Sequence, residues 1–271
     1  TQGREVVGLM MRLWNEQAPN GGSAHNRCCA PDAVERARQV AAQFDIPFYV
    51  LDARNPFRRK VVDFFVEGYS SGVTPNPCLE CNRHIRWDFL LRKALSLGAT
   101  HLATGHYARV HKHGQEYRLL RAVDKSKDQS YALSVLGQEQ LAHTIFPVGM
   151  YTKLQVREIA RRLELPVFDL HDSQDLCFLA DGDYRRFLQE RVPEAMQPGP
   201  IVDSKGERWG EHQGLPRYTI GQRRGIEVAS KVPMYVIAMD SDSNTLVIGP
   251  REALGQSQLR ASRVNWVRGF P

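Results

Sequence analysis

The sequence lacks several patterns that would assign it to a large class of proteins. Its apolar runs fall short of the ~18 residues that a membrane-spanning helix needs, and its first residues do not have the pattern of a secretory signal peptide. It has no internal repeat and no low-complexity segment. With 42% hydrophobic and 24% charged residues among 271, the chain has a globular composition, which excludes a disordered or fibrous protein.

Two common phosphate-binding patterns are also missing. The sequence contains neither G-x-x-x-x-G-K-[ST] nor G-x-G-x-x-G, the fingerprints of the P-loop and of dinucleotide-binding folds. The only Gly-Gly pair, Gly21-Gly22, does not lie between a strand and a helix. We interpret this pair as a flexible turn.

Cysteine is scarce, and its five copies do not suit a disulfide framework. An odd number is typical of a reducing compartment, so we expect a cytoplasmic protein that uses thiol chemistry. Lys and Arg number 36 against 30 Asp and Glu, a net charge of +6. This surplus is a weak indication of an anionic partner, and the recurring arginine pairs allow a surface that binds RNA.

The first part of the chain alternates strand-like and helix-like segments. The strand-like segments are 6–11, 48–51 and 101–104, and the helix-like segments are 31–44, 55–72, 82–98 and 152–163. Asn55 and Asn82 are the expected N-caps of the second and third helices, and Thr152 with Gln155 forms a capping box. This alternation predicts an α/β fold, with a parallel sheet and helices on both of its faces.

The pattern changes near residue 178. One helix is expected at 184–191, and a β-hairpin is expected from 234–239 and 245–249, joined by a polar turn. The sequence therefore predicts three parts: an α/β domain over 1–178, a small central domain over 179–213, and the start of a C-terminal β domain over 214–271.

Cys78 and Cys81 form a Cys-x-x-Cys pattern in a proline-rich loop directly before a helix. The positive end of a helix dipole lowers the pKa of a nearby thiol and so favours a nucleophile. The alternatives are a structural Cys-x-x-Cys, or a zinc site completed by Cys28 and Cys29. That adjacent pair lacks the two-residue spacer of a zinc ribbon.

Cys177 stands alone in a polar segment just before Phe178. A lone cysteine beside an aromatic residue is usually buried and inert. The preceding segment, 172–175, carries two carboxylates, a serine and a glutamine, which favours a reactive position. Two distant cysteines that meet in space would suit a sulfur relay, in which one carries a persulfide and the other resolves it.

Two further segments could bind a ligand. Thr104-Gly105-His106-Tyr107 follows a predicted strand, at the end where open α/β sheets bind ligands, and Gly105 would let a nucleotide approach the main chain. An ordinary turn between elements is the alternative. The cluster from Lys127 to Tyr131 could hold an anion, or it could be a solvated helix start.

Seven segments, in this order and at about this spacing, resemble the bacterial and organellar tRNA-specific 2-thiouridylases. They are GLMMRLW at 8–14, Cys28-Cys29, TPNPCLECN at 74–82, ATGHYAR at 103–109, KDQSY at 127–131, DSQDLCF at 172–178 and YTIGQRRG at 218–225. Each motif alone is modest, whereas the series is specific and covers almost the whole chain.

The resemblance implies a PP-loop ATPase-like α/β domain, a small central domain and an incomplete β-barrel. It implies a sulfurtransferase that replaces the C2 oxygen of the wobble uridine of tRNA with sulfur. ATP, with Mg²⁺ expected, would activate the base by adenylation, and a persulfide would deliver the sulfur. The implied partners are tRNA and a sulfur-carrier or cysteine desulfurase-type donor protein, with no membrane.

The resemblance also carries roles to particular residues. Cys81 would be the nucleophile and Cys177 the persulfide carrier, and the two would form a transient disulfide. Met11 and Gly105 would line the ATP site. The implied tRNA contacts are Asn76, Pro77, Cys78, Lys127, Asp128 and Gln129. The family has Asp or Cys at position 78, so Cys78 is not expected to be essential, and no residue is implied as a metal ligand.

One departure concerns the family's Ser-Gly-Gly-x-Asp-Ser loop, which binds pyrophosphate at a helix N-terminus. That loop precedes the first residue of this sequence, and the family's barrel continues past Pro271. We therefore expect residues 1–271 by themselves not to adenylate tRNA. The alternatives are a non-catalytic tRNA-binding remnant of the same fold, and a zinc-stabilised module built on Cys28, Cys29, Cys78 and Cys81.

Overall fold

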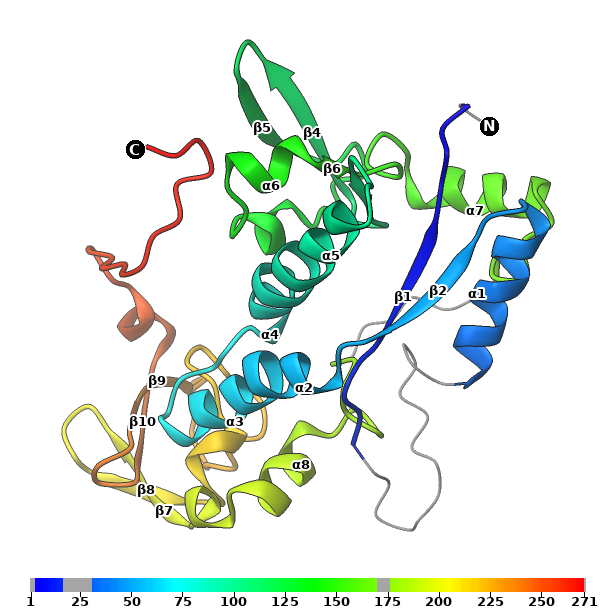
Figure 1. Ribbon diagram of the computed structural model, residues 1–271. Coiled ribbons are helices and arrows are strands. Elements are labelled where there is room, and N and C mark those ends of the chain that lie inside the picture. Colours follow the sequence, from blue (N-terminus) through cyan, green and yellow to red (C-terminus); the bar gives the residue numbers. More distant parts are fainter. Residues whose placement is uncertain (1–2, 17–30, 170–175, 271) are drawn as a thin grey trace. The chain divides into compact units, whose positions relative to one another are not determined.

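The computed structural model describes residues 3–16, 31–169 and 176–270 (Figure 1). Contacts divide the chain into two compact units. The first comprises 1–61, 77–180 and 263–271, and the second comprises 62–76 and 181–262. These units interleave along the chain, so they are a different division from the three consecutive parts expected from the sequence, which stay a prediction.

The first unit contains the parallel strands. β1 (Gly8–Arg12) pairs in parallel with β2 (Phe48–Asp52), and β3 (Leu102–Ala103) pairs in parallel with β6 (Thr144–Ile145). β4 (Ala108–His113) and β5 (Glu116–Arg121) form an antiparallel hairpin. The predicted α/β class is confirmed, although within the described residues the parallel strands of this unit form two separate pairs rather than one continuous sheet.

The helices of the first unit follow the predicted periodicity. They are α1 (Pro31–Gln43), α2 (Arg54–Phe57), the π-helical η1 (Arg58–Val62), α4 (Pro77–Glu80), the π-helical η2 (Cys81–Leu90), α5 (Leu91–Ser96), η3 (Ser130–Leu133), α6 (Gln138–Ala142) and α7 (Lys153–Arg162). The predicted capping box of α7 is confirmed, because Gln155 N–H donates to Thr152 Oγ1 and Thr152 N–H donates to Gln155 Oε1. Within the described residues, no helix is long and apolar enough to cross a membrane.

The two asparagines expected as N-caps lie inside helices instead. Asn55 is the second residue of α2, whose N-cap is Ala53. Asn82 is buried in η2, and its side-chain amide donates to the Ala132 carbonyl at 2.8 Å. The helix that contains it begins at Pro77, a residue well suited to a first helical turn.

The core of the first unit packs η2 and α5 against β3, β4 and α6. It contains Trp87, Leu90, Leu91, Leu102, Ala108, Leu133, Leu136, Leu141 and Phe146, and Met11 and Leu51 pack against it. The Trp87 indole donates to Thr144 Oγ1 at 2.7 Å, and this hydroxyl donates to the Gln140 carbonyl at 2.6 Å. The helix that starts with the cysteines is therefore fixed to β6 by a buried polar chain as well as by apolar packing.

The second unit is built on a four-stranded sheet in the order β8 (Arg208–His212), β7 (Gly199–Asp203), β10 (Thr245–Gly249) and β9 (Tyr235–Asp240). β7 and β10 are parallel and the other pairs are antiparallel, so the predicted hairpin is β9 with β10. The helical elements are α3 (Asp63–Ser70), α8 (Tyr184–Arg191), η4 (Pro193–Met196), η5 (Leu215–Arg217) and η6 (Arg251–Leu254). Over the described residues the sheet does not close, in agreement with the incomplete barrel expected.

Candidate functional site

Cys78 and Cys81 lie on the first two turns of the helix that begins at Pro77. Cys78 is exposed by surface area, and Cys81 is 9% exposed. Although part of the residue reaches the surface, the groups packed around the Cys78 thiol keep water from it, and this burial raises the pKa of the thiol. The positive charge of Arg86 opposes this rise without cancelling it. The expected lowering by the helix dipole is thus wrong for Cys78, because the thiolate loses more hydration than the nearby charges restore.

Arg86 is the charged neighbour that Cys78 shares with His106. Burial, with a smaller contribution from Arg86, lowers the pKa of His106 to about 4. The imidazole is therefore neutral at pH 7, and its Nδ1 lies 2.9 Å from Thr104 Oγ1. The ring centroid is 5.5 Å from that of Trp87. The Cys-x-x-Cys loop and the segment after β3 thus meet around Arg86, which sequence reasoning did not single out.

Gly105 and Met11 lie at the carboxyl ends of β3 and β1, the ends at which parallel strands bind ligands. Gly105 is exposed, and a Cβ built on it would meet no atom within 4 Å. Met11 is half-buried opposite Leu51. Binding of ATP at Met11 and Gly105 stays a prediction. A glycine-rich loop for its phosphates is not found among residues 3–16, 31–169 and 176–270.

Asp128 and Gln129 shape the loop that contains them. Gln129 Oε1 accepts the Tyr107 N–H at 3.0 Å, while Gln129 N–H donates to the Tyr107 carbonyl at 2.8 Å. The Asp128 carboxylate accepts the Ala122 N–H and the Ser130 hydroxyl, both at 2.8 Å. Burial acts to raise the pKa of Asp128, but these hydrogen bonds outweigh it and lower the pKa. Both side chains therefore have a scaffolding role, and contact of Lys127, Asp128 and Gln129 with tRNA stays a prediction.

The loop before Cys78 is held within the second unit. Thr74 Oγ1 donates to Thr219 Oγ1 at 3.1 Å, which joins the start of this loop to the motif 218–225. Pro75 of the same loop lies against α3 at Gly68. A side chain at position 68 would prevent this contact, since its Cβ would lie 2.9 Å from Pro75 Cγ. The boundary between the two units falls between Asn76 and Pro77. Of the implied tRNA contacts, Asn76 thus belongs to the second unit, whereas Pro77 and Cys78 belong to the first.

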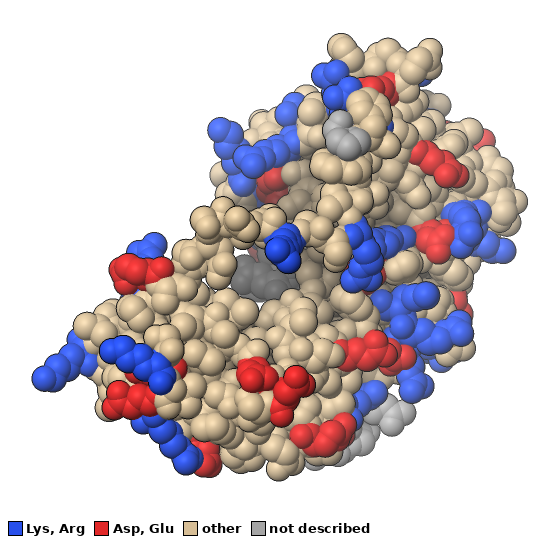
Figure 2. Space-filling model, turned by 90° about the vertical axis from the view of Figure 1, so that its left-hand side faces the viewer, with Lys and Arg blue, Asp and Glu red and all other residues tan. Residues whose placement is uncertain are grey.

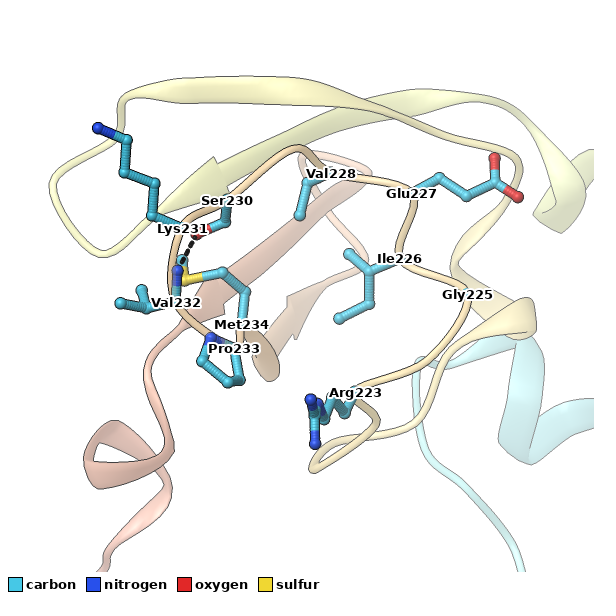
Figure 3. Close-up of a pocket in the computed structure, with 10 residues that line it drawn as sticks. All are labelled: Arg223, Gly225, Ile226, Glu227, Val228, Ser230, Lys231, Val232, Pro233 and Met234. Atoms are coloured by element: carbon cyan, nitrogen blue, oxygen red, sulfur yellow. Dashed lines mark hydrogen bonds between the residues drawn. The ribbon is translucent and has the colours of Figure 1, made fainter.

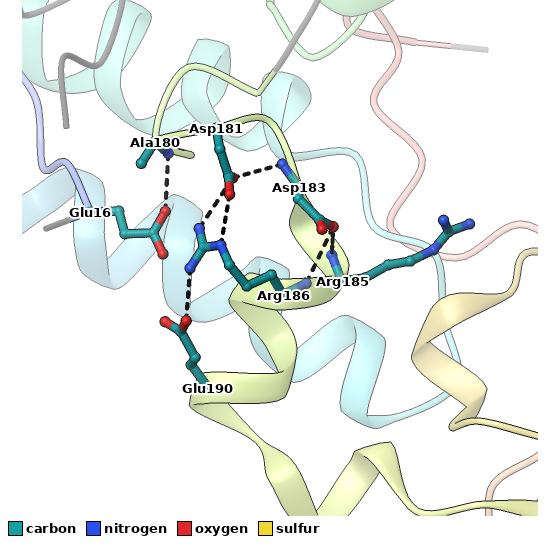
Figure 4. Close-up of polar contacts among 7 residues, drawn as sticks. All are labelled: Glu16, Ala180, Asp181, Asp183, Arg185, Arg186 and Glu190. Carbon is teal, nitrogen blue, oxygen red and sulfur yellow. Dashed lines mark hydrogen bonds and ion pairs between the residues drawn. The ribbon is translucent and has the colours of Figure 1, made fainter. Parts of the chain in front are cut away.

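Cys177 is half-buried at the start of an anchored segment. The Phe178 ring packs edge-on against Phe57, with centroids 6.1 Å apart. Glu16, only 5% exposed, donates its N–H to the Phe178 carbonyl at 3.4 Å, and its carboxylate accepts the Ala180 N–H at 3.0 Å (Figure 4). The strand region around β1 therefore fixes the residues that directly follow Cys177.

The second unit starts with its own polar anchor, also drawn in Figure 4. Arg186 Nε donates to Asp181 Oδ2 at 2.8 Å, and Arg186 Nη1 donates to Glu190 at 3.0 Å. The hydrogen bonds from Arg186 lower the pKa of Asp181 to about 2. Asp183 is the N-cap of α8, accepting the Arg185 and Arg186 N–H groups.

A concavity of about 380 Å³ lies in the second unit, inside the loop that runs from Arg223 to Met234 (Figure 3). The turn that leads into this loop is fixed on β9, because the Val236 N–H donates to the Gln222 carbonyl at 2.9 Å. Val232 N–H donates to Ser230 Oγ within the loop itself. None of the predicted site residues lines this concavity.

The zinc alternative requires Cys28, Cys29, Cys78 and Cys81 together. Cys28 and Cys29 lie outside the described residues, as do Asp172 and Ser173 of the segment before Cys177. In the part of the chain that the structure covers, no three His, Cys, Asp or Glu side chains are grouped to hold a metal ion.

Comparison with known proteins assigns this architecture to a family. Residues 1–181 match the family described as "tRNA methyl transferase HUP domain", and residues 185–250 match "tRNA methyl transferase PRC-barrel domain". The chain is thus a HUP-type α/β domain followed by a PRC-barrel region.

Curated relatives make the assignment narrower. The tRNA-specific 2-thiouridylase MnmA of Heliobacterium modesticaldum is 48% identical over 269 residues, which is 98% of this chain and 69% of that protein. MnmA of Roseiflexus castenholzii is 46% identical over 98% of this chain and 76% of its own length, and MnmA of Chloroflexus aurantiacus is 47% identical over 99% and 75%. The chain belongs to the tRNA-specific 2-thiouridylase family, as the seven motifs predicted.

Proposed function

We propose that this protein is a tRNA-uridine 2-sulfurtransferase that acts on the wobble uridine. The observation that carries the proposal is the identity of 46–48% over nearly the whole chain to proteins named as tRNA-specific 2-thiouridylases. The matching domain descriptions speak of methyl transfer. The printed name of the relatives specifies thiolation instead, and a sulfur relay needs two thiols, which Cys81 and Cys177 would supply.

When bound, ATP with Mg²⁺ would supply the adenylyl group that turns the C2 oxygen of uridine into a leaving group. Met11 and Gly105 would hold its nucleoside end at the carboxyl ends of β1 and β3. The neutral His106 ring, which packs against the buried Trp87, would border the same edge with a weakly hydrated surface. Such a surface favours reaction at a base over hydrolysis, because it holds little water.

Sulfur would pass through the two cysteines. The persulfide of a donor protein, itself a sulfur carrier or cysteine desulfurase, would load Cys177 with one sulfane sulfur. The Cys81 thiolate would attack the inner sulfur of that persulfide, forming a Cys81–Cys177 disulfide and releasing hydrosulfide. Hydrosulfide would then add to C2 as the activated oxygen leaves, and a dithiol reductant would reduce the disulfide for the next cycle.

The tRNA would be held by several small basic areas. On the face shown in Figure 2, Lys and Arg side chains lie among Asp and Glu side chains, so the net charge of +6 is not gathered there into one unbroken patch. Asn76, Pro77 and Cys78 would approach the target base, and Lys127, Asp128 and Gln129 would contact the RNA from the loop that Gln129 fixes to Tyr107.

Two half-reactions test this function without requiring turnover. Purified chain is titrated with unmodified tRNA, and separately incubated with a cysteine desulfurase and ³⁵S-cysteine, after which the labelled cysteine is mapped. We expect tRNA binding and, in a Cys81→Ser background that cannot release the sulfur, a label on Cys177 that is lost when Cys177→Ser is added and kept when Cys78→Ser is added. A label that survives Cys177→Ser would contradict the relay, and binding without any loading would favour the non-catalytic remnant.

A further inference from the structure

A cleft of about 550 Å³ lies along the outer edge of β5, in the first unit. Its walls come from β5, from the turn into η3 and from residues 267–268. This volume is within the range of small-molecule sites in proteins. Asp128 and Ser130 border the cleft, which places it directly beside the loop expected to contact tRNA. We call it the β5 cleft.

Two side chains cap the edge of β5 at its ends. The Tyr117 N–H donates to Gln138 Oε1 at 2.7 Å, and the Tyr117 carbonyl accepts from Gln138 Nε2 at 2.9 Å. At the other end, the Arg121 carbonyl accepts from Arg109 Nε at 2.7 Å. Because hydrogen-bond direction alternates along an antiparallel strand, Leu119, two residues after Tyr117, also directs its N–H and carbonyl away from β4. Neither group has a hydrogen-bond partner among the described residues, so the cleft presents one donor–acceptor pair.

An aromatic ring stands beside this pair. Tyr131 is 64% exposed, although the next two residues of η3, Ala132 and Leu133, are buried. It borders the cleft together with Leu119. An exposed tyrosine face is a stacking surface for any planar group, and nucleobases of single-stranded RNA are bound on such faces.

The charges at the cleft are positive. Arg118 and Arg121 are exposed along β5, and Arg268 completes the rim. Of the nearby carboxylates, Glu116 is paired with Arg268 at 3.1 Å, and Asp128 accepts hydrogen bonds from Ala122 and Ser130. Arg118 and Arg121 are therefore the groups at this rim that suit a phosphate.

We propose that the β5 cleft binds one unpaired nucleotide of the tRNA, outside the reaction centre. Its base stacks on Tyr131 and hydrogen-bonds to the main chain of Leu119, and its phosphate lies on Arg118 and Arg121. The inference rests on the proposed function for the identity of the RNA. Every base edge offers neighbouring donors and acceptors, so this contact anchors the substrate with little sequence selection.

A protein strand added to β5 is the other occupant that such an edge could take. The cap at Tyr117 disfavours it, because strand addition needs several successive main-chain pairs. The Arg121 carbonyl is moreover already bonded to Arg109 Nε at 2.7 Å, which leaves Leu119 as the complete pair on offer. One residue of open edge suits a base better than a strand.

Dissociation constants of the whole chain for unmodified tRNA test the cleft. We expect Tyr131→Leu to weaken binding about fivefold or more, equivalent to the loss of ~1 kcal/mol of stacking. Tyr131→Phe keeps the ring and should bind like wild type, as should Tyr151→Leu, a control at an exposed tyrosine elsewhere in this unit. Wild-type affinity in Tyr131→Leu overturns the cleft and leaves the proposed function standing. Failure of the unaltered chain to bind tRNA overturns both.

Photocrosslinking identifies the occupant directly. The chain with benzoylphenylalanine in place of Tyr131 is irradiated with tRNA in the presence of the sulfur-donor protein. A crosslink to an unpaired tRNA nucleotide supports the proposal. A crosslink to the sulfur-donor protein and not to tRNA overturns the proposal in favour of strand addition. The absence of any tRNA crosslink while tRNA is bound also overturns the proposal.

Discussion

Gln129 hydrogen-bonds to both main-chain groups of Tyr107: its own main-chain N–H donates to the Tyr107 carbonyl at 2.8 Å, and its side-chain Oε1 accepts the Tyr107 N–H at 3.0 Å. Two motifs that are separate in the sequence, 103–109 and 127–131, therefore form one structural element. A residue implied as a tRNA contact has a measurable structural task, and the two roles can be separated by mutation.

The first prediction separates them. Gln129→Ala leaves the buried Tyr107 N–H without its acceptor and should destabilise the protein by ~1–3 kcal/mol. Gln129→Glu keeps an acceptor oxygen and should retain stability in urea unfolding at pH 7. If Gln129 also contacts tRNA, the Glu variant should bind tRNA more weakly, because it adds a negative charge near phosphates. Equal stability of the Gln129→Ala and wild-type proteins would show that the hydrogen bond from Tyr107 to the Gln129 side chain contributes little to the free energy of unfolding.

The second prediction concerns pH. The pKa of His106 is lowered to about 4, whereas an unfolded histidine titrates near 6.5, so the unfolded chain binds the proton first as pH falls. The stability from neutral His106 is complete above pH ~6.5 and is lost as pH falls toward ~4. From pH 7 to pH 5 it should fall by about 2 kcal/mol more in wild type than in His106→Gln. Identical pH profiles for the two proteins would contradict the assignment.

The third prediction concerns the direction in which a glycine-to-alanine replacement changes the stability of the protein. Gly68 lies inside α3, where glycine-to-alanine replacement normally stabilises by ~1 kcal/mol. A Cβ at this position would meet the rigid Pro75 ring at 2.9 Å, so Gly68→Ala should lower the melting temperature instead. Gly210→Ala, whose Cβ would meet only atoms at 3.9 Å or beyond, is the control and should change the melting temperature little. A stabilised Gly68→Ala protein would mean that the loop 74–76 is not held against α3.

The fourth prediction tests the anchor beside Cys177. Glu16→Ala removes the acceptor of the Ala180 N–H and should loosen the segment that begins at Cys177. We expect iodoacetamide to label Cys177 faster in this variant, by about fivefold if ~1 kcal/mol of anchoring is lost. Glu16→Gln retains an acceptor and should label close to the wild-type rate. Labelling is followed by peptide mass spectrometry, and an unchanged rate in Glu16→Ala would count against the anchor.

Much of the fold followed from local pattern. The period of apolar residues, the capping box at Thr152 and the polar turn between β9 and β10 are all encoded within a few neighbouring residues, so these elements could be predicted. The positions of Asn55 and Asn82 inside helices, rather than at N-caps, could not be predicted in this way. Asn82 is used for a contact with Ala132, a residue 50 positions away, and local spacing carries no information about such a partner.

The candidate site divides in the same way. Cys81, Cys177 and Gly105 could be proposed as candidates because cysteines and a glycine after a strand are visible in the sequence, and their roles stay predictions. Arg86 and Glu16 were missed, because their importance comes from distant neighbours: Arg86 lies near Cys78 and His106, and Glu16 accepts from Ala180. The raised pKa of Cys78 likewise reflects burial by the folded chain, which outweighs the local effect of the helix start.

The sulfur relay between Cys177 and Cys81 is the central claim, and one measurement tests it most directly. Chain loaded by a persulfide donor is digested without reductant, and the peptides that contain the two cysteines are identified by mass spectrometry. The relay predicts a Cys81–Cys177 disulfide in wild type, and one additional sulfur retained on Cys177 in Cys81→Ser. Sulfur retained on Cys177 in wild type to the same extent as in Cys81→Ser, with no linked peptide, would contradict it.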